Sequence, residues 1–383
     1  MSWKPSDIKW LDWEISSFCN AGCVDCNRWV WNPRTDEMNL NSYNKDINKF
    51  MTPAQFEHRI KQFEHLRFTL FQGNVGDPMT HPQIHELVEI TFKHNPDIRL
   101  EINSNGSVGA LKTWQKLCEH ANKDILLVFS IDGLEDTNHI YRRGCDWNKI
   151  MRNAKMWIDA GGQAEWAMVD FPFNEHQRKE ARQMAGDMGF KDFHIRERTS
   201  PDPEFDAWIL EKQHEPVQQK LMPAEDFYPL DVQKDFDMET LAKWNNRKIE
   251  PACTYLDAEG FNHWPNFHIN VEGTLWPCCF TSNLPYMQEY DRVIWQGMDA
   301  KYTEKYGPNW NNLDHHTLEE ILATDWFSKD LQAGWEPDSK SELLVCKKNC
   351  CEKGYVWDQP MGEMVKQNKF GAPDESTDNW GKN

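Results

Sequence analysis

The chain has 383 residues, of which 39% are hydrophobic and 27% charged, a composition typical of a globular protein and a length that suits two domains. The 42 Lys and Arg residues against 61 Asp and Glu residues give a net charge of −19. Because sequence-independent binding to phosphate backbones needs a clustered basic face, this acidic net charge disfavours nucleic acid as a partner. No apolar run approaches the ~20 residues of a membrane span, and no basic segment precedes an apolar one at the N-terminus. We therefore expect no membrane segment and no signal peptide, and a cytoplasmic location.

The first predicted strand, within residues 8–15, leads directly into a cysteine-rich loop. Cys19, Cys23 and Cys26 form a C-x3-C-x2-C array. Three thiolates on one short loop can hold three irons of a four-iron cluster and leave the fourth iron open to a substrate or cofactor. A zinc knuckle and buried structural thiols are the alternatives. Zinc sites usually bring two C-x2-C pairs or a Cys/His set, and no histidine follows at such a spacing.

Strands and helices alternate along the next part of the chain, after a polar, Asn-rich insertion at residues 27–50. Thr52 followed by Pro53 is a good helix start. The predicted helices cover residues 52–66, 82–94, 111–120, 147–160 and 175–188, and the further strands cover residues 67–72, 98–103, 125–131, 164–171 and 192–196. This alternation predicts parallel βαβ units, and six of them make an incomplete (β/α)6 barrel. The chemistry of such a barrel belongs at the carboxyl ends of the strands, where the cysteine array lies.

Further motifs follow the predicted strand ends. After the second strand, Gly76 would let the backbone approach a ligand closely, and Asp77 supplies a carboxylate for an ammonium group. A simple Gly/Pro turn is the alternative at this point. The third strand ends in Asn-Ser-Asn-Gly and the fourth in Ser-Ile-Asp-Gly, and the polar residues that these turns contribute are Asn105, Ser130 and Asp132. The cysteines Cys118 and Cys145 are isolated, and we expect them to pack as small hydrophobic residues.

The rest of the chain is divided by composition. Residues 201–250 are acidic and punctuated by proline, which predicts a helix-poor bridging segment between a barrel at residues 1–200 and a second domain at residues 251–360. In that domain, Glu272-Gly273 predicts a two-residue hairpin turn, and a helix is expected at residues 318–331. Residues 361–383 form a polar tail. The cysteines of the second domain are Cys253, Cys278, Cys279, Cys346, Cys350 and Cys351.

These motifs together resemble those of the radical S-adenosylmethionine (SAM) superfamily. The array resembles the family's cluster signature, although Asp25 stands where an aromatic residue is usual. The three strand-end motifs resemble the family's GGE, TNG and SIDG elements. The resemblance implies a [4Fe-4S] cluster on the array with SAM on its open iron, and Asp77 on the SAM amino group. It also implies that the polar residues of the SIDG element face the ribose and methionine ends of SAM. Arg142 corresponds to an arginine that pairs with the SAM carboxylate in relatives, with a surface arginine at a helix start as the alternative.

The C-terminal part resembles the SPASM/Twitch extension of this family, a small cysteine-rich α+β domain. In that extension a hairpin with a G-x4-C element, here Gly273 to Cys278, and a later cysteine group bind an auxiliary cluster. The resemblance implies one auxiliary [4Fe-4S] cluster with these ligands: Cys253, Cys278, Cys346 and Cys350. Cys279 and Cys351 are spare, and the sequence does not choose within each adjacent pair. A zinc-stabilised domain with the same thiolates is the alternative.

The implied function is that of an enzyme that cleaves SAM reductively to a 5′-deoxyadenosyl radical and abstracts a substrate hydrogen. A flavodoxin- or ferredoxin-type protein would supply the electron, and the auxiliary cluster would assist oxidation or cross-linking of a small molecule or peptide. Because only 18 residues precede Cys19, we expect no N-terminal leader-binding domain, which favours a small molecule or a separately delivered peptide. A non-catalytic iron–sulfur carrier or scaffold is the rival hypothesis, and the SAM-pocket motifs argue against it.

Overall fold

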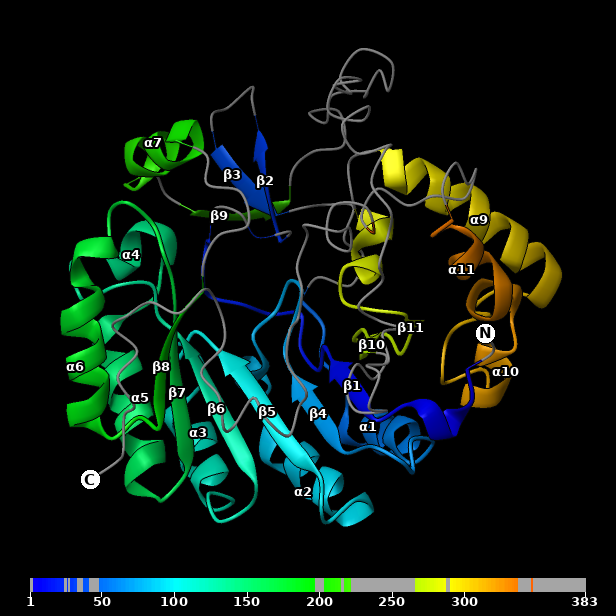
Figure 1. Cartoon of the computed structure of the whole chain (residues 1–383), viewed down its shortest axis with the longest axis horizontal. Coiled ribbons are helices and arrows are strands. Elements are labelled where there is room, and N and C mark those ends of the chain that lie inside the picture. The colour runs from blue at the N-terminus through cyan, green and yellow to red at the C-terminus, as the bar shows by residue number, and fades with distance from the viewer. Residues whose placement is uncertain are drawn as a thin grey trace.

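The computed structural model describes residues 3–23, 26, 28–32, 37–40, 48–196, 203–214, 217–221, 266–286, 290–336 and 346. Its main sheet has eight strands in the order β11-β10-β1-β4-β5-β6-β7-β8 (Figure 1). The six strands of the predicted barrel are β1 (Trp10–Trp13), β4 (Phe68–Phe71), β5 (Arg99–Ser104), β6 (Ile125–Ser130), β7 (Gln163–Val169) and β8 (Asp192–Arg196). All six run parallel, and the sheet is open, which confirms the partial (β/α)6 barrel.

Helices connect these strands and, apart from the short helix that follows β6, cover the outer face of the sheet (Figure 1). They are α1 (Pro53–Ile60), α2 (Ile84–His94), α3 (Leu111–Cys118), α4 (Asn138–Tyr141), α5 (Trp147–Asp159) and α6 (Arg178–Met188). The predicted start of α1 is confirmed, since Thr52 Oγ1 accepts a hydrogen bond from the Gln55 backbone N–H and Gln55 Oε1 accepts one from the Thr52 N–H. This capping box satisfies two donors that the helix end would leave unpaired.

The two faces of the barrel strands differ in chemistry because side chains alternate along a strand. On the outer face, Trp13 of β1 packs edge-on against Phe56 and Phe63, with ring centroids 4.8 Å and 6.0 Å away. On the inner face, Asp12 is fully buried and hydrogen-bonds the indole N–H of Trp10. The outer face therefore supplies the hydrophobic core, and the inner face leaves polar groups inside the barrel.

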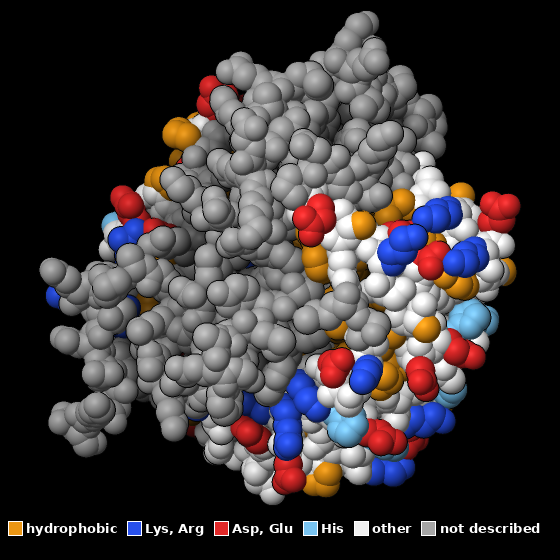
Figure 2. All heavy atoms as spheres, turned by 45° about the vertical axis from the view of Figure 1, so that its right-hand side comes forward, with side chains coloured by type: hydrophobic (Ala, Val, Ile, Leu, Met, Phe, Trp, Pro, Cys, Tyr) orange, Lys and Arg blue, Asp and Glu red, His pale blue; other side chains and the backbone are white. Residues whose placement is uncertain are grey.

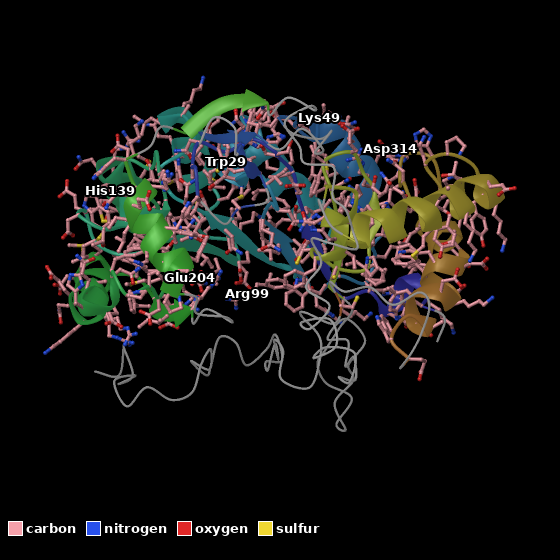
Figure 3. All side chains as sticks on the ribbon, turned by 90° about the horizontal axis from the view of Figure 1, so that it is seen from above. Trp29, Lys49, Arg99, His139, Glu204 and Asp314 are labelled. Atoms are coloured by element: carbon pink, nitrogen blue, oxygen red, sulfur yellow. The ribbon has the colours of Figure 1, made fainter. Side chains whose placement is uncertain are left out.

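A C-terminal hairpin extends the barrel sheet. Strand β10 (Asn266–Ile269) runs parallel to β1, and β11 (Leu275–Trp276) pairs antiparallel with β10. The predicted hairpin is confirmed, but its loop has three residues, Val271 to Gly273, rather than the two expected, because the Asn270 N–H donates to Thr274 O. Gly273 has a φ of +89°, a left-handed conformation that favours glycine. Lys49 forms an ion pair with Glu272 of this turn, and in Figure 3 both Lys49 and Asp314 lie on the side where the C-terminal helices pack. The described part of residues 251–360 thus contributes two strands to the sheet of the barrel. The domain boundaries remain a prediction from the sequence.

Several elements differ from the sequence prediction. The segment expected to be poor in helix contains α7 (Pro203–Lys212), and α9 (Tyr290–Tyr306) was not predicted because its apolar residues are not confined to one face. The helix expected at residues 318–331 is divided into α10 (Leu318–Leu322), a π-helical turn (Trp326–Asp330) and α11 (Leu331–Ala333). The Asn-rich insertion contains a hairpin. Its strands β2 (Trp29–Asn32) and β3 (Glu37–Leu40) form a separate sheet with β9 (Val217–Leu221) of the bridging segment.

The C-terminal helices present a surface of mixed charge. Lys301 and Lys305 of α9 pair with Asp330 and Asp325 at 2.6 Å and 2.5 Å. On the described part of the face in Figure 2, basic and acidic side chains are likewise interspersed.

Candidate active site at the cysteine loop

The loop that follows β1 is fastened to other loops at the carboxyl ends of the strands. The backbone N–H of Asp77, after β4, donates to Phe18 O at 2.7 Å. The N–H of Gly22 donates to Arg143 O, in the loops after β6, at 2.8 Å. Trp29 at the start of β2 closes the loop from the other side, donating its indole N–H to Ala21 O at 3.1 Å. The loop is therefore held in place by strand ends far apart in the sequence.

The three cysteines of the array lie within electrostatic reach of one another in this loop. Burial raises the pKa of Cys19 and Cys23 to about 12 and that of Cys26 to about 11. The charge of another cysteine of the array also acts to raise the pKa of each thiol. Thiolates crowded in a buried place need a cation to offset their charge, and an all-sulfur donor set suits iron–sulfur clusters or zinc. The residues present therefore fit a cluster held by three cysteines.

Asp77 and Asn105 lie beside Cys19. Asp77 Oδ1 accepts hydrogen bonds from the Met79 N–H at 3.0 Å and the Ser104 hydroxyl at 2.8 Å, and its Oδ2 accepts one from the Asn105 N–H at 2.8 Å. The Asn105 side-chain amide lies 3.8 Å from Cys19 Sγ. Burial raises the pKa of Asp77 to about 6, while these hydrogen bonds oppose the rise. The carboxylate thus joins the ends of β4 and β5 next to the cysteine loop.

Gly76 is required by the packing of two strand ends. A Cβ atom at this position would lie 1.8 Å from the carbonyl oxygen of Ser16, at the end of the first strand. No side chain fits at such a distance. The sequence prediction is that the backbone at Gly76 approaches a ligand closely. In the structure, the close approach is to the backbone of Ser16.

Arg142, which is partly buried, and the fully buried Asp132 form an ion pair at the same edge of the sheet. The distance from Arg142 Nε to Asp132 Oδ2 is 2.7 Å, and the Nε–H does not point at this oxygen, so the contact is an ion pair rather than a hydrogen bond. Asp132 Oδ1 accepts from the Val169 N–H at 2.7 Å. Burial acts to lower the pKa of Arg142, but the charges of Asp132 and Cys23 raise it. Ser130, also predicted at this site, is the last residue of β6 and is half-buried.

Two residues near the array were not identified from the sequence. Arg28 follows the third cysteine by two positions, and its backbone N–H lies 3.5 Å from Cys26 Sγ. Cys145 packs against the hydrophobic core as we expected, but burial and then the charge of Cys23 raise the pKa of its thiol, so this thiol also lies close to the array. Cys145 follows the predicted site residue Arg142 by three positions, and this spacing could have indicated that it lies near the array.

Two of the described C-terminal cysteines, Cys278 and Cys279, lie near the inner face of β1. Burial raises the pKa of Cys278 and Cys279, and the charge of Asp12 acts on both thiols. Asn74, in the loop after β4, donates its side-chain amide to Cys279 O at 2.9 Å. Cys346 is buried. The other predicted ligands and their spare neighbour, Cys253, Cys350 and Cys351, lie outside the described residues.

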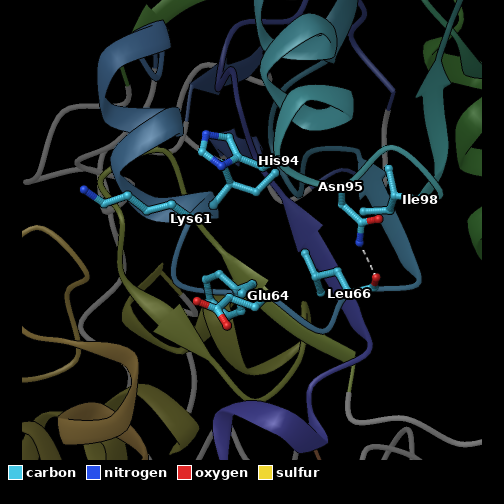
Figure 4. Close-up of a pocket in the computed structure, with 8 residues that line it drawn as sticks. Lys61, Glu64, Leu66, His94, Asn95 and Ile98 are labelled. Carbon is cyan, nitrogen blue, oxygen red and sulfur yellow. Dashed lines mark hydrogen bonds between the residues drawn. The ribbon is translucent and has the colours of Figure 1, made fainter.

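A surface pocket lies at the other end of the barrel strands (Figure 4). Leu66 and Ile98, which line it, come just before β4 and β5, and Lys61, Glu64 and His94 also line it. The cysteine loop follows the carboxyl end of β1, so this pocket is remote from the candidate site.

Comparison with known proteins identifies the family. The radical SAM superfamily matches residues 13–185, from β1 into α6. This chain is a radical SAM enzyme. Membership implies SAM and a [4Fe-4S] cluster as cofactors and SAM-dependent radical chemistry. No curated protein sequence matches the chain.

Solved structures of Streptococcus suis SuiB share the fold of this radical SAM enzyme. The structure of SuiB bound to S-adenosylmethionine superposes with a TM-score of 0.52 at 13% identity, covering 89% of this chain and 72% of SuiB. SuiB bound to its precursor peptide SuiA gives a TM-score of 0.52 at 14% identity, covering 86% and 67%. Among the described helices, none has both the length and the apolar character that crossing a membrane demands.

Proposed function

We propose that Cys19, Cys23 and Cys26 hold the [4Fe-4S] cluster of this radical SAM enzyme, with SAM on its open iron. When bound, the cluster would supply the electron that cleaves SAM to methionine and a 5′-deoxyadenosyl radical. The observation that carries the proposal is the path from Cys19 Sγ through Asn105 to Asp77, with contacts of 3.8 Å and 2.8 Å. It connects the predicted cluster loop to the carboxylate predicted to bind the SAM amino group.

Asp77 is suited to bind an ammonium group. Its Oδ1 accepts two hydrogen bonds and its Oδ2 accepts one from Asn105, and a carboxylate offers about four lone-pair sites. A further acceptor site therefore remains on Oδ2. The fixed geometry would orient the amino group of SAM with little loss of side-chain entropy.

Arg142 is suited to bind the SAM carboxylate. Its guanidinium has five N–H donors, and its ion pair with Asp132 is at Nε. The terminal nitrogens would meet the carboxylate near Cys23, while Asp132 holds the side chain in place. Ser130 and the remaining polar groups of this turn would then face the ribose and methionine ends of SAM.

An auxiliary cluster on Cys253, Cys278, Cys346 and Cys350 is the second part of the proposal. The position of Cys278 and Cys279 beside Asp12 of β1 supports it, because a group held there would face the inside of the barrel. Structural zinc on the same thiolates is the alternative. The substrate would lie between the two metal sites, and would be a small molecule or a peptide.

The proposed reaction requires an external one-electron donor, and we propose a flavodoxin or ferredoxin in the cytoplasm. A non-catalytic iron–sulfur carrier is the competing function. Incubation of reconstituted, dithionite-reduced protein with SAM separates the two. We expect 5′-deoxyadenosine and methionine in equal amounts. A protein that binds iron but releases no 5′-deoxyadenosine would refute the catalytic proposal.

A further inference from the structure

Arg28 is buried directly beside the cysteine array. Its side chain is 1% exposed. Nη1 donates to Ser17 O at 2.6 Å and to Val75 O at 3.2 Å, and Nη2 donates to Asn48 Oδ1 at 2.7 Å. Nε, which is also buried, has no hydrogen-bond partner among the described residues. The guanidinium is thus held in one position by three loops.

The partners that fix Arg28 do not neutralise it. Ser17 O, Val75 O and Asn48 Oδ1 are uncharged acceptors. Within the described part of the chain, the negative groups that act on the guanidinium are Cys19 and Cys26, followed by Glu14. Glu14 Oε1 in turn accepts a hydrogen bond from the Val75 N–H at 3.0 Å. Because arginine stays protonated in proteins, a full positive charge lies next to two of the three proposed cluster ligands.

A buried positive charge affects how readily a neighbouring cluster accepts an electron. Reduction of a [4Fe-4S] cluster adds one negative charge without breaking a bond, and opposite charges attract more strongly inside a protein than in water. Cluster potentials depend on net charge, hydrogen bonds to sulfur and solvent exposure. A fixed cation at Arg28 would therefore stabilise the reduced form more than the oxidised form.

We propose that Arg28 is a positioning residue that raises the reduction potential of the cluster on Cys19, Cys23 and Cys26. This inference rests on the proposed function of those cysteines. Arg28 lies two positions after the array in the sequence, and this proposal gives it a role in addition to holding the loop in place. A purely structural role would affect how much cluster is bound, whereas the proposed role affects the potential of the cluster that is bound.

The test is a redox titration with dithionite, followed by electron paramagnetic resonance (EPR). The signal used is the one that changes on addition of SAM, so that an auxiliary cluster does not contribute. In Arg28→Gln we expect the ratio of reduced to oxidised cluster at a given potential to fall about tenfold, which is about 59 mV for a one-electron couple. Arg28→Lys keeps the charge and should show a smaller fall.

Two further variants separate charge from packing. Arg59→Gln removes another buried arginine that binds backbone carbonyls, on α1, and should leave the potential unchanged. Asn48→Asp changes an exposed residue, so it tests the proposal even if Arg28→Gln takes up no iron. Its carboxylate would keep the contact to Nη2 and offset the guanidinium charge, so the potential should fall.

The outcomes are distinct. Unchanged potentials in Arg28→Gln or in Asn48→Asp, with iron bound, would overturn this inference and leave the proposed function intact. A parent protein whose cysteine array binds no iron would overturn the proposed function and this inference together. A fall in potential in both variants, with none in Arg59→Gln, would support it.

Discussion

Arg59 of α1 and Asp314 form a two-point ion pair across 255 residues of chain, with Nε–Oδ1 at 2.8 Å and Nη2–Oδ2 at 2.6 Å. The same guanidinium donates to the carbonyl oxygens of Val271 and Glu272, both at 3.1 Å. A Cβ atom on Gly273 would lie 2.6 Å from Arg59 Cζ. Arg59 therefore fastens the C-terminal hairpin to the first helix of the barrel.

Loss of this contact should destabilise the fold. In Arg59→Ala, a buried carbonyl group, a partly buried carbonyl group and a carboxylate lose their donor, and we expect the free energy of unfolding to fall by about 3 kcal/mol. Urea unfolding followed by circular dichroism measures it. Lys93→Ala, which removes the exposed pair with Glu57, is the matched control and should cost much less, because exposed ion pairs contribute little to stability. Equal losses in the two variants would contradict the fastening role.

The stability of the protein should depend on the ionisation of Glu165. Burial and then the charges of Glu101 and Asp192 raise its pKa to about 7. A raised carboxyl pKa means that the folded state binds the proton more tightly, so this contribution is complete below about pH 4.5 and is lost as the pH rises through 7. Its size is at most about 3 kcal/mol.

Glu165→Gln should therefore flatten the fall in stability between pH 5 and about pH 8. The free energy of unfolding would be measured by denaturant titration across this range. Glu175→Gln, at an exposed position, is the control and should follow the parent curve. A parent protein whose stability is constant over this range would show that the pKa of Glu165 is not raised.

The cysteine array should be required for SAM cleavage but not for folding. Cys23→Ala removes one of three proposed ligands, so we expect no 5′-deoxyadenosine above background and an unchanged circular dichroism spectrum. Cys118→Ala, at a half-buried cysteine whose Sγ contacts Met156 O, should retain cleavage. Cleavage at the parent rate in Cys23→Ala would remove the array from the site.

Asp77 should contribute to SAM affinity. Its charge-assisted contact to the amino group is worth about 1.5–3 kcal/mol, so Asp77→Ala should weaken SAM binding by about ten- to a hundred-fold with little change in iron content. Calorimetric titration measures the affinity. Because Ser104 and Asn105 also lose their acceptor, the variant should be less stable by about 1–3 kcal/mol. An unchanged SAM affinity would leave Asp77 only the second, structural role.

Metal content should distinguish one cluster from two. Two four-iron clusters require about eight irons per chain, and the double variant of Cys253→Ala and Cys346→Ala should retain about four. Iron and zinc would be measured together by plasma mass spectrometry. About four irons and one zinc in the parent protein would contradict the auxiliary cluster and support structural zinc.

Much of the barrel was predictable because its signals are local. The strands at Ile125–Ser130 and Asp192–Arg196 and the helix at Trp147–Asp159 follow from hydrophobic periodicity and turn residues within a few positions. The same holds for the array of Cys19, Cys23 and Cys26, whose spacing on one loop already indicates a metal site. The position of Arg142 near that site was predicted only through resemblance.

The tertiary structure alone decided which distant segments meet. Strand β10 pairs with β1, and β9 pairs with β3, through backbone hydrogen bonds between segments that are far apart in the chain. The sequence of a strand does not specify which other strand it pairs with. The same is true of the contacts of Asp77 with Asn105, of Asp132 with Arg142, and of Arg28 with three loops around the cysteines. Local patterns specify which residues are buried and polar, but the partner that satisfies a buried polar group is fixed only when the chain is folded.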